Sequence, residues 1–176
     1  MELVGDRIVL REYTSADWPS VASYQADRRY LSFCAPETAS AEQPRALVDL
    51  FVSWAREEPR RNFQLAMVDR ASGELIGSCG LRMADLPAGI AEFGLELSPE
   101  FWGRGLGTEA SRALLDFGFR AMALTEVRAI SVSGNTRISA LLRKLGFTGA
   151  GTRPGETWMD DRGWTFTDWV LTRSAW

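Results

Sequence analysis

The sequence contains no histidine, and this absence removes several common catalytic arrangements. Ser-His-Asp and Cys-His nucleophiles and the common zinc enzymes rely on imidazole. A general base in this chain is therefore a carboxylate, a lysine, a tyrosine, a cysteine or a water held by the backbone. Cys34 and Cys79 are too few and too isolated for a disulfide scaffold or a zinc cluster. We predict that both are buried, reduced thiols and that the chain holds no metal.

A basic excess and a long apolar run are also missing. The net charge is -3 and the basic residues are scattered, which argues against a nucleic-acid partner. No run approaches the length of a membrane span, and residues 1–10 read as a strand rather than a signal peptide. We therefore expect a cytoplasmic protein without a membrane partner. The length of 176 residues and the 45% apolar content fit a single domain over residues 1–176.

A strand, a glycine loop and a helix follow one another in residues 92–119. Residues 93–97 alternate as in a strand, Gly103, Gly105 and Gly107 then take every second position, and apolar residues at helical spacing follow. Such a loop presents free backbone N–H groups to an anion, and glycine lets a phosphate approach the main chain. The alternative is a tight turn whose glycines only supply unusual backbone angles. The strand before and the helix after the loop favour an anion site.

The other elements follow from periodicity and turn signals. Strands are predicted at residues 7–13, 62–68, 75–81, 91–97 and 126–133, with two more in 148–173 joined by a turn at 160–163. Helices are predicted after residues 14–17, after residue 40, after the glycine loop and after Asn135, whereas residues 28–36 read as irregular. Two strands joined through a helix are usually parallel. The order therefore predicts an α/β (α+β) fold with a mixed, mostly antiparallel sheet of about seven strands flanked by helices.

Two motifs together carry a resemblance to a known family. They are WGRGLGTEA at residues 102–110 and NTRISALLRKLGF at residues 135–147. With the element order, they resemble the GNAT N-acetyltransferase superfamily over essentially the whole chain, and the RimJ/RimL-type (ribosomal-protein N-acetyltransferase-like) branch most of all. The resemblance implies an acetyl-CoA-dependent N-acetyltransferase whose sheet is splayed around the strand at 91–97.

The resemblance also implies which residues bind acetyl-CoA. In such enzymes the pantetheine arm enters the splayed gap and the pyrophosphate rests on loop amides at a helix N-terminus. Carried over residue by residue, Asn135 would reach the pantetheine or the acetyl group from the next helix. The other cofactor-binding residues would be Leu95, Leu97, Trp102, Gly103, Arg104, Gly105, Leu106, Gly107 and Thr108.

The chain departs from the family where the proton donor to the departing thiolate is usually found. Ile138 stands where the RimJ/RimL branch commonly has serine, and Leu142 stands where many other members have tyrosine. Ser139 lies one place beyond the usual serine and is the substitute candidate, with water as the alternative. The acyl-chain preference and the oligomeric state, monomer or homodimer, stay open.

An amine acceptor must lose a proton before it attacks a thioester, so the reaction needs a base. Glu92 is the first candidate, because it lies on the central strand opposite the face of Phe93. Glu96 shares its face and is the second. The alternative is that either glutamate only pairs with an arginine such as Arg82 on a neighbouring strand.

The sequence says less about the acceptor. The resemblance implies an amine, either a small molecule or a protein N-terminus. The segments that form the wall of the acceptor pocket in GNAT enzymes contain Tyr30, Phe33, Trp158 and Trp164 here. At least half of the aromatic residues in these segments should be core. Asp168 on the last strand is a candidate to attract a cationic amine, although exposed carboxylates are usually just solvated.

Two other functions compete with this interpretation. Residues 105–110 satisfy the dinucleotide-binding pattern G-x-G-x-x-A, but a Rossmann chain should open with that unit and carry an acid at the end of the next strand, which here ends in Ser133. A Walker loop fails because no lysine follows Gly107. The non-enzymatic alternative is an acyl-CoA-binding sensor or partner module that has lost turnover, which the missing proton donors would explain.

Overall fold

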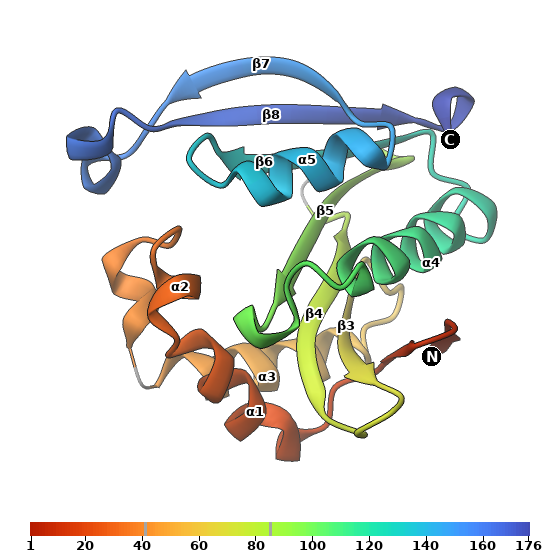
Figure 1. Cartoon of the computed structure of the whole chain (residues 1–176). Helices are drawn as coiled ribbons and strands as arrows, with labels where there is room; N and C mark the ends of the chain where they lie inside the picture. Colours follow the sequence, from red (N-terminus) through yellow and green to blue (C-terminus); the bar gives the residue numbers. More distant parts are fainter. Residues whose placement is uncertain (41, 85) are drawn as a thin grey trace.

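The computed structural model describes residues 1–40, 42–84 and 86–176. An eight-stranded sheet runs through it in the order β1-β2-β3-β4-β5-β6-β8-β7 (Figure 1). Its strands are β1 (Glu2–Val4), β2 (Ile8–Arg11), β3 (Asn62–Asp69), β4 (Leu75–Arg82), β5 (Ile90–Leu97), β6 (Glu126–Val132), β7 (Thr148–Pro154) and β8 (Thr165–Thr172).

The sheet confirms the predicted fold class. The β5–β6 pair is parallel, and the other six neighbouring pairs are antiparallel. The sheet has eight strands rather than about seven because Glu2–Val4 pairs with β2 as an edge strand of its own. β1 and β7 form the two edges, so the sheet is open.

The described ranges contain five α-helices, which flank the sheet (Figure 1). They are α1 (Trp18–Gln25), α2 (Arg28–Leu31), α3 (Gln43–Trp54), α4 (Leu106–Arg120) and α5 (Thr136–Lys144). Short 3-10 turns occupy η1 (Ser15–Asp17), η2 (Pro36–Ala39), η3 (Pro99–Phe101), η4 (Thr157–Arg162) and η5 (Arg173–Ala175). Within the described residues, no helix combines the length and apolar character needed to cross a membrane.

Two segments differ from the prediction because each holds only a short turn of helix. Residues 28–36 were expected to be irregular, but α2 begins there behind Asp27, whose side chain accepts a hydrogen bond from the Arg29 backbone N–H at 2.8 Å. Four residues are too few to show helical periodicity. Residues 160–163, expected to be a simple turn, lie in η4 and its C-terminal Gly163, which has a φ of 61°.

Alternation along β3, β4 and β5 sends apolar side chains to both faces of the sheet. One face packs with α4 and α5 in a cluster that includes Leu65, Leu81, Phe93, Leu114 and Leu142. The other face packs with α1 and α3 in a smaller cluster that includes Tyr13, Val21, Tyr24, Val48 and Ala66. The helices therefore form a layer on each side of the sheet.

β5 and β6 are paired over a short stretch only. Residues 90–92 pair with residues 126–128, while β5 continues to Leu97 and β6 to Val132. The strands therefore diverge after Glu92, and the sheet opens between them (Figure 1). This opening confirms the splay expected around the strand at 91–97.

Candidate functional site

The glycine loop places a helix N-terminus at the opening of the sheet. Gly103 and Gly105 have φ values of 76° and 80°, in the left-handed region that favours glycine. Gly105 is the N-cap of α4 and has no side chain with which to cap it. The first-turn N–H groups of a helix have no intrahelical partner, so those of α4 are free to hold an anion.

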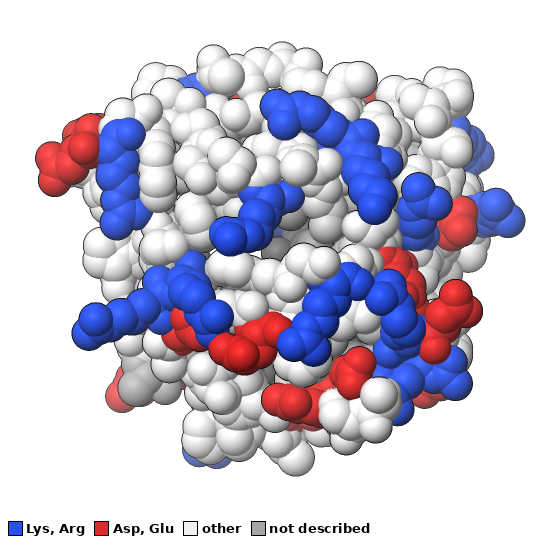
Figure 2. All heavy atoms as spheres, viewed as in Figure 1, with Lys and Arg blue, Asp and Glu red and all other residues white. Residues whose placement is uncertain are grey.

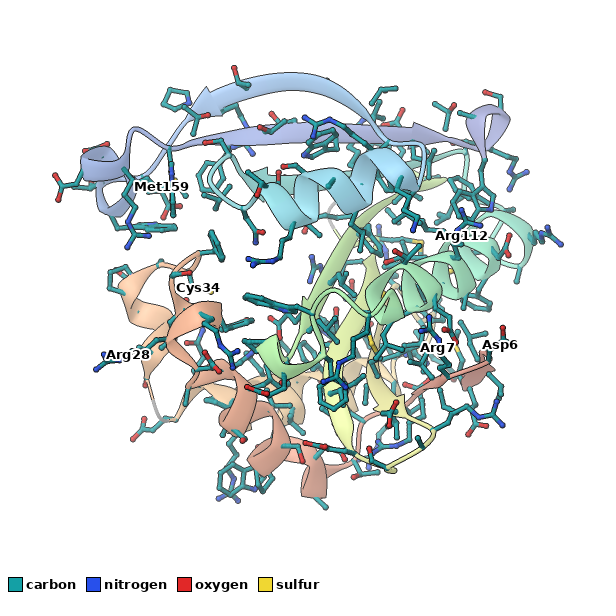
Figure 3. All side chains as sticks on the ribbon, in the orientation of Figure 1. Asp6, Arg7, Arg28, Cys34, Arg112 and Met159 are labelled. Atoms are coloured by element: carbon teal, nitrogen blue, oxygen red, sulfur yellow. The ribbon has the colours of Figure 1, made fainter. Side chains whose placement is uncertain are left out.

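The N-terminal segment braces this loop from outside. The Arg7 guanidinium donates to the Arg104 carbonyl at 2.8 Å and to the Glu109 carboxylate at 2.9 Å. Glu109 also accepts from the backbone N–H groups of Arg7 and Ile8, at 2.7 and 3.3 Å. Burial alone would raise the pKa of Glu109, but these hydrogen bonds outweigh it and lower the pKa. Figure 3 shows Arg7 beside α4.

A cavity of about 660 Å³, called here the loop cavity, adjoins the glycine loop. Its walls come from the loop, β5, α5 and residues 30–34. Arg137 and Lys144 of α5 contribute to it, and Figure 2 shows Lys and Arg side chains on two sides of a hollow in this face. Figure 3 places Cys34 beside α2, where it also lines the cavity. The cavity thus combines apolar walls with basic side chains and a helix N-terminus.

Most of the residues predicted to bind the cofactor line this cavity. They are Leu95, Leu97, Trp102, Gly103, Gly105, Gly107, Thr108 and Asn135. The Trp102 indole N–H donates to the Leu97 carbonyl at 2.8 Å, which ties the loop to the end of β5. Arg104 and Leu106 stand apart, because Arg104 lies over the Phe101 ring and Leu106 is buried in the core.

A second cavity of about 340 Å³, called here the trough, lies along β5 beside α3. α3 contributes Leu47, Leu50, Phe51 and Trp54 to its walls, and β3, β4, β5, β6 and α5 contribute the rest. Leu95, Glu96 and Ile138 line both cavities. The two cavities therefore meet at the diverging end of β5.

Glu96 lies at this junction and is held by two buried side chains of α1. Its Oε2 accepts from the Tyr24 hydroxyl at 2.9 Å and from the Gln25 amide at 3.0 Å. Burial raises the pKa of Tyr24 well above its usual value, and the charge of Glu96 raises it further. Tyr30 meets the Tyr24 ring edge-on at 5.8 Å, and the same two causes raise its pKa. Both phenols are therefore protonated at neutral pH.

Glu92 lies in the trough in a different environment. Its carboxylate accepts from the Arg82 guanidinium at 2.7 Å, and both side chains are partly exposed. Pairing with Arg82 is the alternative to a functional role that the sequence left open for Glu92. Glu92 and Glu96 share a face of β5, as predicted, but have different partners.

The remaining predicted residues divide between the loop cavity and other surroundings. Tyr30 and Phe33 line the loop cavity, and Phe33 stacks on Trp164 with ring centroids 5.8 Å apart. Trp158 donates to Glu156 at 2.8 Å and lies outside both cavities. Asp168 accepts three hydrogen bonds from the Arg153 guanidinium, which satisfies its charge.

Ser139 and Asn135 use their polar side chains within α5. The Ser139 hydroxyl donates to the Asn135 carbonyl at 3.3 Å, and Ser139 is 8% exposed and lines neither cavity. The Asn135 side chain caps the helix by accepting from the Ile138 N–H at 3.3 Å. Among the described residues, no group of three His, Cys, Asp or Glu side chains is placed to hold a metal ion.

The sequence analysis did not identify Tyr24 and Gln25 of α1 as site residues. A signal was present, because Gln25 is a polar residue that is buried at the end of this helix. Leu47, Leu50, Phe51 and Trp54 of α3 share one face of their helix, and that face lines the trough.

Comparison with known proteins agrees with this geometry. A family model described as "Acetyltransferase (GNAT) domain" matches residues 7–148. The protein named Uncharacterized N-acetyltransferase p20, from Bacillus licheniformis, is 29% identical over 148 residues, which are 82% of this chain and 81% of that protein.

Solved structures show the same fold. The ribosomal-protein-S5-alanine acetyltransferase from Vibrio fischeri matches with a TM-score of 0.81 and 17% identity, over 100% of this chain and 98% of that chain. The microcin C7 self immunity acetyltransferase MccE, solved in complex with acetyl-CoA and AMP, matches with a TM-score of 0.79 and 14% identity. That match covers 95% of this chain and 93% of the other.

Proposed function

This chain belongs to the GNAT acetyltransferase family, and from that premise we propose that residues 1–176 act as a single N-acetyltransferase domain of the RimJ/RimL type. Enzymes of this family use acetyl-CoA and acetylate amines. The domain would move the acetyl group by direct attack of a primary amine, without an acetyl-enzyme intermediate. The observation that carries the proposal is the position of Glu96, which lines both cavities where they meet.

The loop cavity fits acetyl-CoA. The loop from Trp102 to Thr108 would hold the diphosphate on its amides, because left-handed glycines and an uncapped helix N-terminus leave those N–H groups free. Arg137 and Lys144 add positive charge on the other wall. The diverging end of β5 would offer backbone groups to the pantetheine arm.

Glu96 is the residue we propose as the base. It lies at the junction of the cavities, whereas Glu92 is paired with Arg82. Bonds from Tyr24 and Gln25 fix its carboxylate, which leaves one oxygen to accept a proton from the amine. Glu92 would then affect the electrostatic potential in the trough and would not accept the proton of the amine.

The reaction also needs a proton for the thiolate. The amine nitrogen attacks the thioester carbon, the C–N bond forms, the C–S bond breaks, and the sulfur leaves as a thiolate. An ammonium acceptor gives up two protons in all, of which one ends on the thiol and one in solvent. Tyr30 is our candidate donor, because it lines the loop cavity and its phenol can donate a proton. Ser139 is less suited, since its hydroxyl already donates to the Asn135 carbonyl.

The test is thiol release from acetyl-CoA with a panel of primary amines and short peptides, alongside calorimetry with acetyl-CoA. We expect heat of binding and amine-dependent thiol release. Binding without release for any acceptor would favour the second candidate, an acyl-CoA-binding sensor, which the absence of tyrosine and serine at positions 142 and 138 continues to support. No heat with acetyl-CoA would overturn both.

A further inference from the structure

We propose that the trough binds a small primary monoamine that carries an apolar group, and that Leu50 and Ile130 select for that group. The inference rests on the proposed function and names the class of acceptor. It depends on three features of the trough: a floor opened by glycine, apolar walls left exposed by the fold, and a charge balance that suits one cation.

Strand register explains why the trough exists. Gln64, Gly80 and Gly94 are paired across β3, β4 and β5 on the face that meets α3. The next row toward one end of the strands contains Arg82 and Glu92, and the row toward the other end contains Ser78 and Glu96. The glycine row therefore leaves a hollow between two polar rows.

The glycines have little tolerance for a side chain. A Cβ on Gly94 would lie 2.8 Å from the Arg82 guanidinium, and one on Gly80 would lie 2.0 Å from the Gln64 amide oxygen. Glycine at these positions thus lets the two polar side chains lie flat across the sheet. The floor of the trough is low because Arg82 and Gln64 lie flat over glycines that have no side chain of their own.

The walls of the trough include apolar side chains that are exposed and are not part of the core. Val48 of α3 is fully buried, whereas Leu50 is 41% exposed and faces the trough. Ile130 of β6 is 47% exposed and also lines it. Among the described residues, five large apolar side chains are classed as exposed, and these are two of them. Apolar lining around a few placed polar groups is typical of a small-molecule site.

The charges of the trough favour a single cation. The Arg82 and Glu92 charges offset each other at 2.7 Å, which leaves the Glu96 carboxylate as the surplus negative charge of the lining. The Gln64 side chain lines the trough, and within the described residues its buried amide oxygen has no hydrogen-bond partner. A second ammonium of a polyamine would face Leu47, Leu50 and Trp54 and lose its hydration without compensation.

The size of the trough also favours a small acceptor. Its volume of about 340 Å³ is near the lower end of the range for ligand pockets, which is about 300–1,000 Å³. A compact amine with a phenyl or branched alkyl group would place its nitrogen at Glu96 and its apolar group between Leu50 and Ile130. A peptide N-terminus would need room for the chain that follows its first residue.

The experiment compares four acceptors at saturating acetyl-CoA: 2-phenylethylamine, ethanolamine, spermidine and the peptide Phe-Ala-Ala-Ala. We expect 2-phenylethylamine to have the highest kcat/KM. Leu50→Glu should lower this value about tenfold or more, because the apolar wall becomes charged. It should also raise the relative rate with spermidine and leave the KM for acetyl-CoA unchanged. Val4→Glu, at another exposed apolar position, is the matched control. It should change neither the kcat/KM with 2-phenylethylamine nor the relative rate with spermidine.

The outcomes separate the two proposals. Preference for spermidine, ethanolamine or the peptide, or a Leu50→Glu variant with wild-type selectivity, overturns the inference and leaves the acetyltransferase proposal standing. Binding of acetyl-CoA without turnover of any amine overturns the proposed function and the inference with it.

Discussion

Glu92 and Glu96 lie four residues apart on the same face of β5, yet their surroundings differ in kind. Glu92 pairs with Arg82 of the adjacent strand, and Glu96 accepts hydrogen bonds from Tyr24 and Gln25 of a helix. The ion pair with Arg82 offsets the charge of the Glu92 carboxylate. The neutral donors Tyr24 and Gln25 orient the Glu96 carboxylate and leave its charge in place. The arrangement around Glu96 therefore suits a general base that accepts a proton from an amine better than the arrangement around Glu92 does.

We predict that Glu96→Gln lowers kcat with the best acceptor by about 100-fold or more, because a positioned base contributes at least that factor. The amide keeps the shape of the side chain. Glu92→Gln should lower kcat much less, since its main partner is Arg82. Steady-state kinetics with varied amine and varied acetyl-CoA measures both variants.

Glu100→Gln is the control for the charge change, because Glu100 is an exposed residue of η3 that pairs with Arg29. It should retain the wild-type kcat. A larger loss of kcat in Glu92→Gln than in Glu96→Gln would restore Glu92 as the base and contradict our assignment.

The sequence predicted both glutamates as candidates but ranked Glu92 first. Alternation along the strand was enough to place both on one face. It was not enough to identify partners that lie far away in sequence, such as Tyr24 and Gln25, 72 and 71 residues from Glu96. The choice between the two residues depends on tertiary contacts that strand periodicity does not contain.

At the scale of elements, the turn before β2 supports the glycine loop through Arg7. Its guanidinium donates to the Arg104 carbonyl, and the peptide that carries this carbonyl also carries the N–H of Gly105. Carbonyl and N–H point in opposite directions across a planar peptide. Holding the carbonyl on the Arg7 side therefore turns the Gly105 N–H away from Arg7. We infer that Arg7 is a positioning residue for the loop.

We predict that Arg7→Met raises the KM for acetyl-CoA about 2–10-fold, which is the factor expected for the loss of one hydrogen bond of ordinary net strength, here the bond to the Arg104 carbonyl of the loop. The kcat and the KM for the amine should stay unchanged. Glu109 keeps its bonds from the Arg7 and Ile8 backbone, so α4 stays anchored. Initial rates at varied acetyl-CoA measure the effect.

Arg70→Met provides the comparison, because Arg70 makes the same kind of bond to the Gly5 and Asp6 carbonyls without reaching the glycine loop. An equal rise in the KM for acetyl-CoA in both variants would show that Arg7 acts through general stability. A fall in kcat for Arg7→Met alone would also contradict a positioning role.

Elements with a clear period were predicted well, and short ones were not. The helices α3, α4 and α5 and the strands β3 to β6 have enough residues to show a pattern. α2 has four residues and is marked mainly by its N-cap, Asp27. β7 is exposed along its whole length and reads Thr-Gly-Ala-Gly-Thr, which suits an edge strand, whereas β8 buries Trp169 and Leu171. The residues of these two strands therefore indicate that β7 lies at the edge of the sheet and β8 lies inside it.

At the scale of the molecule, the sheet consists of two parts that meet at few places. β1 to β5 form one part and β6, β8 and β7 the other, and residues 90–92 and 126–128 pair across the boundary. At the far end of the opening, Trp164 stacks on Phe33 and the Arg162 guanidinium donates to the Ser32 carbonyl at 2.6 Å. The element order predicted the splay, but this second contact joins loops whose conformation the sequence does not specify.

The loop cavity draws its walls from both parts, so a ligand in it would link them. We predict that CoA at about 100 times its Kd stabilises the protein by about 2.7 kcal/mol, which raises the Tm by about 5–10 °C for a chain of this size. Differential scanning fluorimetry with and without CoA measures the shift. Amide hydrogen exchange should slow in α5 as well as in the glycine loop, because the two lie on opposite walls of the cavity.

Gly103→Ala and Gly73→Ala separate ligand binding from backbone strain. The two glycines have φ values of 76° and 73°, and no atom in the described part of the chain lies within 4 Å of a Cβ added to either. Alanine in this conformation costs about 1–2 kcal/mol, so both variants should lose a similar part of their ligand-free Tm. Gly73 is in the β3–β4 hairpin and should keep the full CoA-dependent shift, whereas Gly103 lines the loop cavity and should lose most of it. If Gly103→Ala keeps the shift, the glycine loop is not where the diphosphate binds.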